Sequence, residues 1–125
     1  MTEDELLFFN RFPAAIPIYQ ELKERLEAAY PDLRVKVSKT QISFYNRRMF
    51  AMASPPWRRV KGWPADYLLV SFGLPYRKEN PRIAQAVEPY PNRWTHHVLI
   101  SSPEEVDQEL TAWVLEAARF SAGKR

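Results

Sequence analysis

The spacing of the apolar residues changes twice along this chain, and that change constrains the fold more than any other feature. Near the C-terminus the apolar residues recur every three or four positions, which is the repeat of an amphipathic helix. In the middle of the chain, apolar and polar residues alternate instead, which is the repeat of a half-buried strand. The helical stripe consists of Val106, Leu110, Trp113, Val114, Ala117 and Phe120, and the clearest alternation covers Leu33–Ser38 and Gln41–Tyr45.

Two helices are expected before the alternating region. Thr2 and Glu5 have the spacing of a capping box, so a short helix is expected to begin there. Phe12-Pro13 interrupts this helix. A second helix is then expected from about Ala14 to Tyr30, with Pro17 tolerated because it lies in the first turn.

About five strands are expected between the helical ends. Besides the two alternating segments, residues 49–53, 66–72 and 94–101 have strand character, whereas residues 82–87 are expected to form one helical turn. A final helix is expected to begin at Ser102-Pro103, a cap followed by proline, and to end near Gly123. Residues 1–125 therefore predict a single α+β domain: a mainly antiparallel sheet with the N-terminal and C-terminal helices packed on one face.

Charge is divided unevenly between these parts. The net charge is +3, but residues 31–101 hold twelve Lys and Arg against four Asp and Glu, whereas residues 1–30 and 102–125 are each acidic. A basic segment attracts anionic partners such as nucleotides, phosphorylated metabolites, nucleic acid or an acidic protein. We therefore expect the sheet region, and not the helices, to carry the binding surface.

Several chemistries lack the residues that they need. The chain has no cysteine, which excludes disulfides, thiolate metal sites and a cysteine nucleophile. Its three glycines are Gly62, Gly73 and Gly123, and they cannot form a Gly-rich nucleotide loop. No serine lies in a nucleophile motif, and only four carboxylates lie in the sheet region. The composition therefore favours holding an anion over breaking a bond, and no cofactor is expected.

Lys39 and Thr40 form the first candidate site, at the junction of two expected strands. An ammonium, a hydroxyl and a backbone N–H can converge on one anion at such a junction. The simpler interpretation is a turn with a solvated lysine, since most charged side chains lie on the surface.

The pair His96 and His97 forms the second candidate. Successive strand residues point to opposite faces, so the two rings cannot chelate one metal ion together, and no metal site is expected. His96 shares a face with Trp94, whereas His97 shares a face with Thr95. Each histidine is either a structural residue of the core or a group that titrates near neutral pH.

The third candidate is a loop rich in tryptophan and basic residues. Two indoles interleaved with cations suit stacking on bases together with neutralisation of phosphates. The alternative is that the tryptophans fold back onto the sheet while the cations project into water, because arginine also stacks on tryptophan in surface loops. The residues concerned are Trp57, Arg58, Arg59, Lys61 and Trp63.

The location is expected to be cytoplasmic. The first residues are acidic, where a secretory signal has a basic start and a long apolar run. The longest unbroken apolar stretch is Met49–Ala53, far shorter than the roughly 20 residues that cross a bilayer. No association with a membrane is therefore expected.

Several motifs together resemble a bacterial family of domains of unknown function. Its members occur alone or at the C-terminal end of larger proteins, some of them labelled as transport proteins. The resemblance extends from about Leu7 to Ala118 and implies that Lys39, Arg82 and a histidine belong to a recurring polar pattern. The matching motifs are Phe12-Pro13, Ile18-Tyr19, Lys39–Phe44, Phe50-Ala51, Leu69–Leu74, Pro81-Arg82-Ile83, Trp94–His97 and Glu104–Asp107.

The leading hypothesis from the sequence is a small binding module with a basic pocket for an anionic ligand, either a nucleotide or a phosphorylated or carboxylated metabolite. The expected contacts are Lys39, Thr40, Arg82, Arg93, His96 and His97. The first alternative is a nucleic-acid-binding domain that uses the sheet face and the Trp57–Trp63 loop. The second is an enzyme with a histidine as general base, and a further one is docking of an acidic protein.

Overall fold

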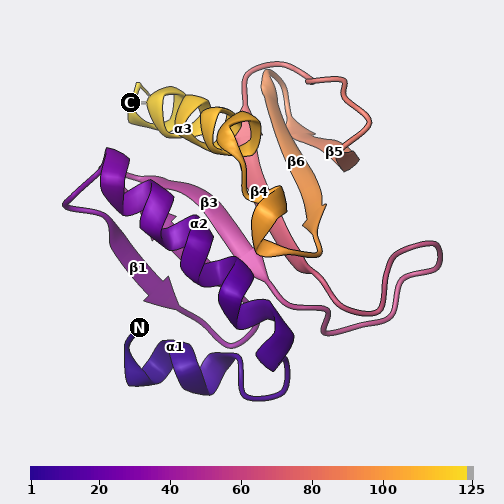
Figure 1. Cartoon of the computed structure of the whole chain (residues 1–125). Helices are drawn as coiled ribbons and strands as arrows, with labels where there is room; N and C mark the ends of the chain where they lie inside the picture. The colour runs from indigo at the N-terminus through magenta and orange to yellow at the C-terminus, as the bar shows by residue number, and fades with distance from the viewer. Residues whose placement is uncertain (124–125) are drawn as a thin grey trace.

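The computed structural model of the chain describes residues 1–123, and within them the strands form one sheet that is flanked by helices (Figure 1). The helices are α1 (Glu3–Phe8), α2 (Ile16–Ala29) and α3 (Gln108–Ala122), with short 3-10 turns at Pro13–Ala15 and Pro103–Glu105. The strands are β1 (Arg34–Val37), β2 (Ile42–Tyr45), β3 (Met49–Ser54), β4 (Leu68–Leu74), β5 (Ile83–Tyr90) and β6 (Arg93–Ile100).

All neighbouring strands of the sheet are antiparallel, in the order β1-β2-β3-β4-β6-β5. The first four strands follow the chain, and the β5–β6 hairpin then adds to β4 through its second strand. Helices α2 and α3 lie over the same face (Figure 1). The expected α+β architecture, with helices from both ends of the chain on one face, is therefore confirmed.

The sixth strand, β5, replaces the helical turn that was expected over residues 82–87, so this prediction is wrong. Ala84, Gln85 and Ala86 favour helix locally, but Gln85 pairs with His97 across the β5–β6 hairpin. Tertiary pairing outweighs a weak local preference of this kind. A two-residue turn, Pro91-Asn92, closes the hairpin, and Asn92 has a positive φ of 64°, a conformation that asparagine tolerates better than most residues.

The last helix also begins later than expected. Pro103–Glu105 forms a separate 3-10 turn, and α3 starts only at Gln108. The reason is the side chain of Asp107, which accepts a hydrogen bond from the backbone N–H of Leu110 at 2.9 Å and thereby caps the helix. The end of the helix at Gly123 agrees with the prediction.

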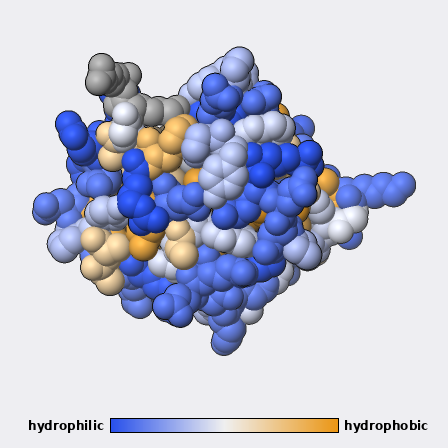
Figure 2. Space-filling view, turned by 90° about the horizontal axis from the view of Figure 1, so that it is seen from above, coloured by the Kyte–Doolittle hydropathy of each residue, from blue (hydrophilic) through white to orange (hydrophobic). Residues whose placement is uncertain are grey.

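The core lies between the sheet and the two long helices. Tyr19 of α2 stacks on Phe44 of β2, with ring centroids 6.0 Å apart, and Trp113 of α3 packs against Phe72 of β4. The most completely buried residues include Phe9, Leu22, Leu26, Ile42, Leu68, Leu74, Ile100 and Leu110. Seen from above, the surface is mostly hydrophilic and shows only small hydrophobic areas (Figure 2). Among residues 1–123, no helix is long and apolar enough to cross a membrane.

Helix α1 is held to α2 by one buried carboxylate. Glu5 is 1% exposed and accepts hydrogen bonds from the hydroxyl of Tyr19 and from Lys23 Nζ at 2.9 Å. The expected capping box is present, since Thr2 and Glu5 bond reciprocally. The carboxylate therefore closes the helix end and joins two helices at once.

Candidate functional site

The two faces of the sheet differ in character. One face packs against α2 and α3, and we call the opposite one the open face. One row of paired residues crosses the open face from β1 to β5: Lys36, Ser43, Met52, Ser71, His97 and Gln85. Alternation and pairing add Arg34, Tyr45, Ser54, Leu69, Gly73, Val87, Tyr90, Arg93, Thr95 and Leu99 to this face. None of these residues is acidic, so the face is positively charged.

The two adjacent histidines lie on opposite faces, as the alternation predicts. His96 is 0% exposed on the helix-packed face, where it stacks on Phe72 with centroids 5.3 Å apart. Its Nε2 accepts the backbone N–H of Lys78 at 2.9 Å, and burial lowers its pKa. His96 thus holds the segment after β4 in place through this hydrogen bond, and solvent does not reach its ring.

His97 lies on the open face and contacts Ser71 on the neighbouring strand. The distance between Ser71 Oγ and His97 Nδ1 is 2.7 Å. Burial lowers the pKa of His97, so the ring is neutral at pH 7 and Nδ1 is free to accept the Ser71 hydroxyl proton. In that tautomer Nε2 carries the only N–H of the ring, and it has no hydrogen-bond partner within residues 1–123.

Arg93 lies over Gly73 on the same face. A Cβ placed on Gly73 would be 2.6 Å from Arg93 Nη2, so the guanidinium rests directly on the backbone of β4. Arg93 is only half-buried, and among residues 1–123 it forms neither an ion pair nor a side-chain hydrogen bond. Thr95, the partner of Gly73 in the register, stands between Arg93 and His97. A cation and three hydroxyl or imidazole groups therefore share one part of the open face.

Arg82 lies away from the open face and contacts the start of α3. Its Nη1 contacts Asp107 Oδ1 and Glu109 Oε1, each at 2.9 Å, and its Nη2 donates to the carbonyl of Glu105 at 2.7 Å. The guanidinium also lies 5.8 Å from the ring of Trp113. These contacts tie the start of β5 to the start of α3 on the helix side, away from the open face.

Lys39 and Thr40 lie in the exposed turn between β1 and β2. This turn is at one edge of the sheet, whereas Arg82 precedes β5 at the other edge. Five strand spacings separate the edges, which is about 24 Å. Of the six residues expected to converge on one ligand, the structure brings only Arg93 and His97 together.

The two tryptophans of the basic loop have different surroundings. Trp57 packs edge-on against Phe8 and Phe12, and its indole N–H donates to the carbonyl of Thr40 at 2.6 Å. Trp63 packs against Tyr67 with centroids 5.8 Å apart, whereas Arg58, Arg59 and Lys61 are exposed. A groove of about 570 Å³, here the Trp63 groove, runs between loop and sheet; it is lined by Ser54, Pro55, Trp57, Arg58, Val60, Trp63, Tyr67, Leu69, Ala84 and Gln85.

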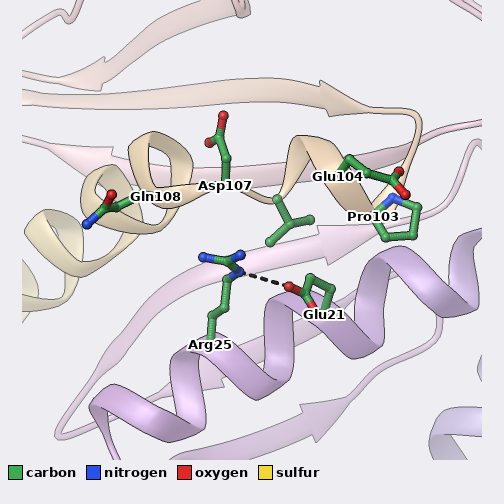
Figure 3. A pocket seen from close by; sticks show the side chains of 7 residues that line it. Glu21, Arg25, Pro103, Glu104, Asp107 and Gln108 are labelled. Carbon is green, nitrogen blue, oxygen red and sulfur yellow. Dashed lines mark hydrogen bonds and ion pairs between the residues drawn. The ribbon is translucent and has the colours of Figure 1, made fainter.

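Another groove, of about 720 Å³, lies between α2 and the segment before α3 (Figure 3). Its single cation, Arg25, is paired with Glu21 at 3.0 Å. Glu104 and Asp107 also line the groove, although the Asp107 carboxylate points away from Arg25 (Figure 3) and is paired with Arg82. Carboxylates outnumber the cation, so this groove repels anions and does not suit the ligand class that the basic segment favours.

Sequence reasoning missed three residues of the open-face group, namely Ser71, Gly73 and Thr95. A signal for two of them was present in β4, where the small residues Ser71 and Gly73 lie two positions apart within an apolar strand. Such positions leave room above a sheet for a long side chain or a ligand.

The fold and the site define a class of protein: an α+β domain with helices over one sheet face and a basic, polar group on the other. Within that class, a family described as a domain of unknown function (DUF5655) matches residues 8–121. The chain belongs to this family, which confirms the resemblance inferred from the motifs. No curated protein and no solved structure matches the chain.

Proposed function

We propose that this protein binds an anionic ligand, a phosphorylated or carboxylated metabolite, on the open face of its sheet. Arg93 is the main charged contact in this proposal. The observation that carries it is the half-buried guanidinium lying over Gly73 without a carboxylate partner among the described residues. A partly desolvated arginine of this kind gains energy from any anion that reaches it.

Neighbouring groups supply further donors. Thr95 carries a hydroxyl, and His97 presents an imidazole N–H at Nε2 once Nδ1 accepts the Ser71 hydroxyl. Ser71, which is 4% exposed, orients the His97 ring and has no O–H left for the ligand. Along a strand, residues two apart are about 7 Å from one another, so different groups of one anionic ligand can reach the guanidinium over Gly73 and the Ser71–His97 pair. The absence of acidic residues from the strand positions of this face removes the main source of repulsion.

The proposed ligand contacts are fewer than the sequence suggested. Arg82 already has three acceptors around it, and Lys39 with Thr40 lies at a distant turn. His96 is buried on the other face. The proposal therefore retains Arg93 and His97 as ligand contacts, adds Thr95, and gives Ser71 the role of orienting the His97 ring.

Titration calorimetry with inorganic tripolyphosphate and with a panel of sugar phosphates and nucleotides tests this function. We expect binding in the micromolar to millimolar range, and at least a tenfold loss of affinity in Arg93→Gln. The matched control is Arg119→Gln, which removes an exposed arginine from α3 on the other side of the sheet. Equal affinity in both variants, or no binding of any anion, contradicts the proposal.

Nucleic-acid binding is the second candidate, because the basic loop extends the positive surface beyond the sheet. Arg58, Arg59 and Lys61 are all exposed, and phosphate contacts by such residues make affinity fall steeply with salt. Binding of a labelled single-stranded oligonucleotide at two salt concentrations distinguishes this candidate. Oligonucleotide affinity that is the same at both salt concentrations counts against nucleic-acid binding.

The cytoplasmic location expected from the sequence belongs to the same proposal, because phosphorylated metabolites are held inside the cell. Cell fractionation with an antibody to the protein tests it, and recovery outside the cytoplasmic fraction counts against both the location and this ligand class.

A further inference from the structure

The Trp63 groove lies next to the proposed anion site on the sheet. Leu69 forms part of the groove wall and lies two residues before Ser71 on β4. Gln85 also lines the groove and is paired with His97 in the register. The groove, the Ser71–His97 pair and Arg93 therefore follow one another along β4.

We infer that the ligand is a nucleoside di- or triphosphate, with its base in the Trp63 groove and its terminal phosphate at Arg93. This inference rests on the proposed function, because it adds a base site to the anion site described above. The groove supplies what a base requires, namely the aromatic surfaces of Trp63 and Tyr67, the apolar floor at Leu69 and the amide of Gln85.

The spacing along β4 favours a chain of phosphates. From Leu69 to Gly73 the strand rises about 14 Å, and Ser71 lies midway. A base with one phosphate extends only as far as Ser71 and His97, so the charge at Arg93 is reached by a second or third phosphate. Arg58, at the wall of the groove, adds a cation at the base end, which complements the total negative charge of such a ligand.

The open face provides for one base and not for a row of them. Its strands carry two aromatic residues, Tyr45 and Tyr90. The guanidinium of Arg34 already lies 5.6 Å from the Tyr45 ring, and Tyr90 pairs with Arg93 at the end of β5 that is farther from the Trp63 groove. Trp57 is fixed against Phe8 and Phe12. Sheets that bind single-stranded RNA expose several aromatic rings on which successive bases stack, so a mononucleotide suits this surface better than a polynucleotide.

The experiment compares ATP, GTP, CTP and UTP with inorganic tripolyphosphate by titration calorimetry on the full chain. We expect at least one nucleotide to bind ten times more tightly than tripolyphosphate. Trp63→Ala and Gln85→Ala should each reduce that advantage to less than threefold while leaving tripolyphosphate affinity unchanged. Arg93→Gln should weaken both ligands, and Arg119→Gln neither. Gln85 is exposed on an edge strand, so Gln85→Ala should fold normally. It therefore tests the base site even if Trp63→Ala fails to fold.

The possible failures are distinguishable. If tripolyphosphate and all four nucleotides bind equally well, the inference is wrong and the anion site stands. If none of these compounds binds, the proposed function itself fails, and the inference with it. If a single-stranded oligonucleotide binds while no mononucleotide does, the surface is a nucleic-acid interface and the inference is overturned.

Discussion

The guanidinium of Arg93 occupies the space above Gly73 that a side chain on residue 73 would need. A Cβ at this position would lie 2.6 Å from Arg93 Nη2, closer than carbon and nitrogen atoms approach without a bond. The arrangement on the open face therefore requires glycine at residue 73 as much as it requires arginine at residue 93. Changing the glycine displaces the cation without removing any charge from the protein.

Gly73→Ala is expected to lower the affinity for tripolyphosphate by tenfold or more and to leave the fold intact. Gly73 does not have a positive φ, so alanine fits the backbone, and the atoms that must move belong to the flexible end of a side chain. Replacing glycine in a strand stabilises the folded state by up to about 1 kcal/mol. Calorimetry and urea denaturation of the same variant measure the two effects separately.

Met52→Ala is the matched control, since Met52 is paired with Ser71 on the same face but does not touch the guanidinium in the described contacts. Its anion affinity should stay within threefold of the unchanged protein. Unchanged tripolyphosphate binding in Gly73→Ala would show that the position of Arg93 is irrelevant to any ligand.

Arg82→Gln is expected to destabilise the protein without affecting anion binding. The substitution removes charged hydrogen bonds to Asp107, Glu109 and the Glu105 carbonyl. Because the guanidinium is partly exposed, we expect a loss of about 1–2 kcal/mol in the free energy of unfolding. Arg82→Lys should restore little of it, since an ammonium does not reach three acceptors in a fork geometry. Chemical denaturation measures the loss, and weakened binding of tripolyphosphate would place Arg82 back among the ligand contacts.

Much of the fold follows from local pattern, because apolar spacing reports which side of an element is buried. The stripe through Leu110, Trp113 and Ala117 becomes the buried face of α3, and alternation places His96 and His97 on opposite faces. Prediction from local pattern fails at β5, where the helix-favouring residues Ala84, Gln85 and Ala86 lie in a strand that pairs with β6. Pairing between strands is a property of the whole sheet, and the local signal was limited to the Pro91-Asn92 turn.

The site is less accessible to sequence reasoning, because it depends on which cations are already paired. Arg82 and Arg93 are alike in the sequence, but Arg82 faces the acidic start of α3 whereas Arg93 crosses a glycine on the open face. The Ser71–His97 contact joins residues 26 positions apart, which no local pattern encodes. Charge distribution predicts a binding surface in the middle of the chain, and only the pairing of strands shows which cations of that region lie together on the open face.

Glu5→Gln is expected to loosen α1 and to remove a source of acid sensitivity. Burial raises the pKa of Glu5, but hydrogen bonds from Thr2, Tyr19 and Lys23 outweigh it and lower the value to about 2. The folded state therefore binds this proton less readily than the unfolded chain, so its stabilising effect is complete above pH 4.5 and is lost as the pH falls towards 2. At pH 7 we expect a loss of about 2–3 kcal/mol.

Denaturation curves at pH 7, 4 and 3 check this expectation. The unchanged protein should lose stability between the last two values more steeply than Glu5→Gln does. Glu3→Gln, an exposed carboxylate on the same helix, is the control and should resemble the unchanged protein. Parallel curves for all three proteins would show that Glu5 does not titrate with folding.

The histidines should make the free energy of unfolding depend on pH in a higher range than Glu5 does. Protonation of His96 should also weaken the packing around it. Burial, together with the charge of Lys78, holds the pKa of His96 below its ordinary value of 6.5. The neutral ring is therefore favoured by folding. The contribution of the neutral ring to the free energy of unfolding is complete above pH 6.5. It declines as the pH falls below that value, because the unfolded chain then binds the proton more readily. Protonation also removes the acceptor for the backbone N–H of Lys78.

His96→Gln and His97→Gln separate the two contributions. Burial lowers the pKa of both rings, so each variant should show a shallower fall in the free energy of unfolding between pH 7.5 and 5 than the unchanged protein. Only His96→Gln should also change amide exchange at Lys78, since this N–H is bonded to His96 Nε2. Hydrogen exchange followed by NMR measures that difference. An unchanged exchange rate at Lys78 in His96→Gln would mean that the buried imidazole does not hold the segment after β4, and that this segment is fixed by the ion pair of Lys78 with Glu116 instead.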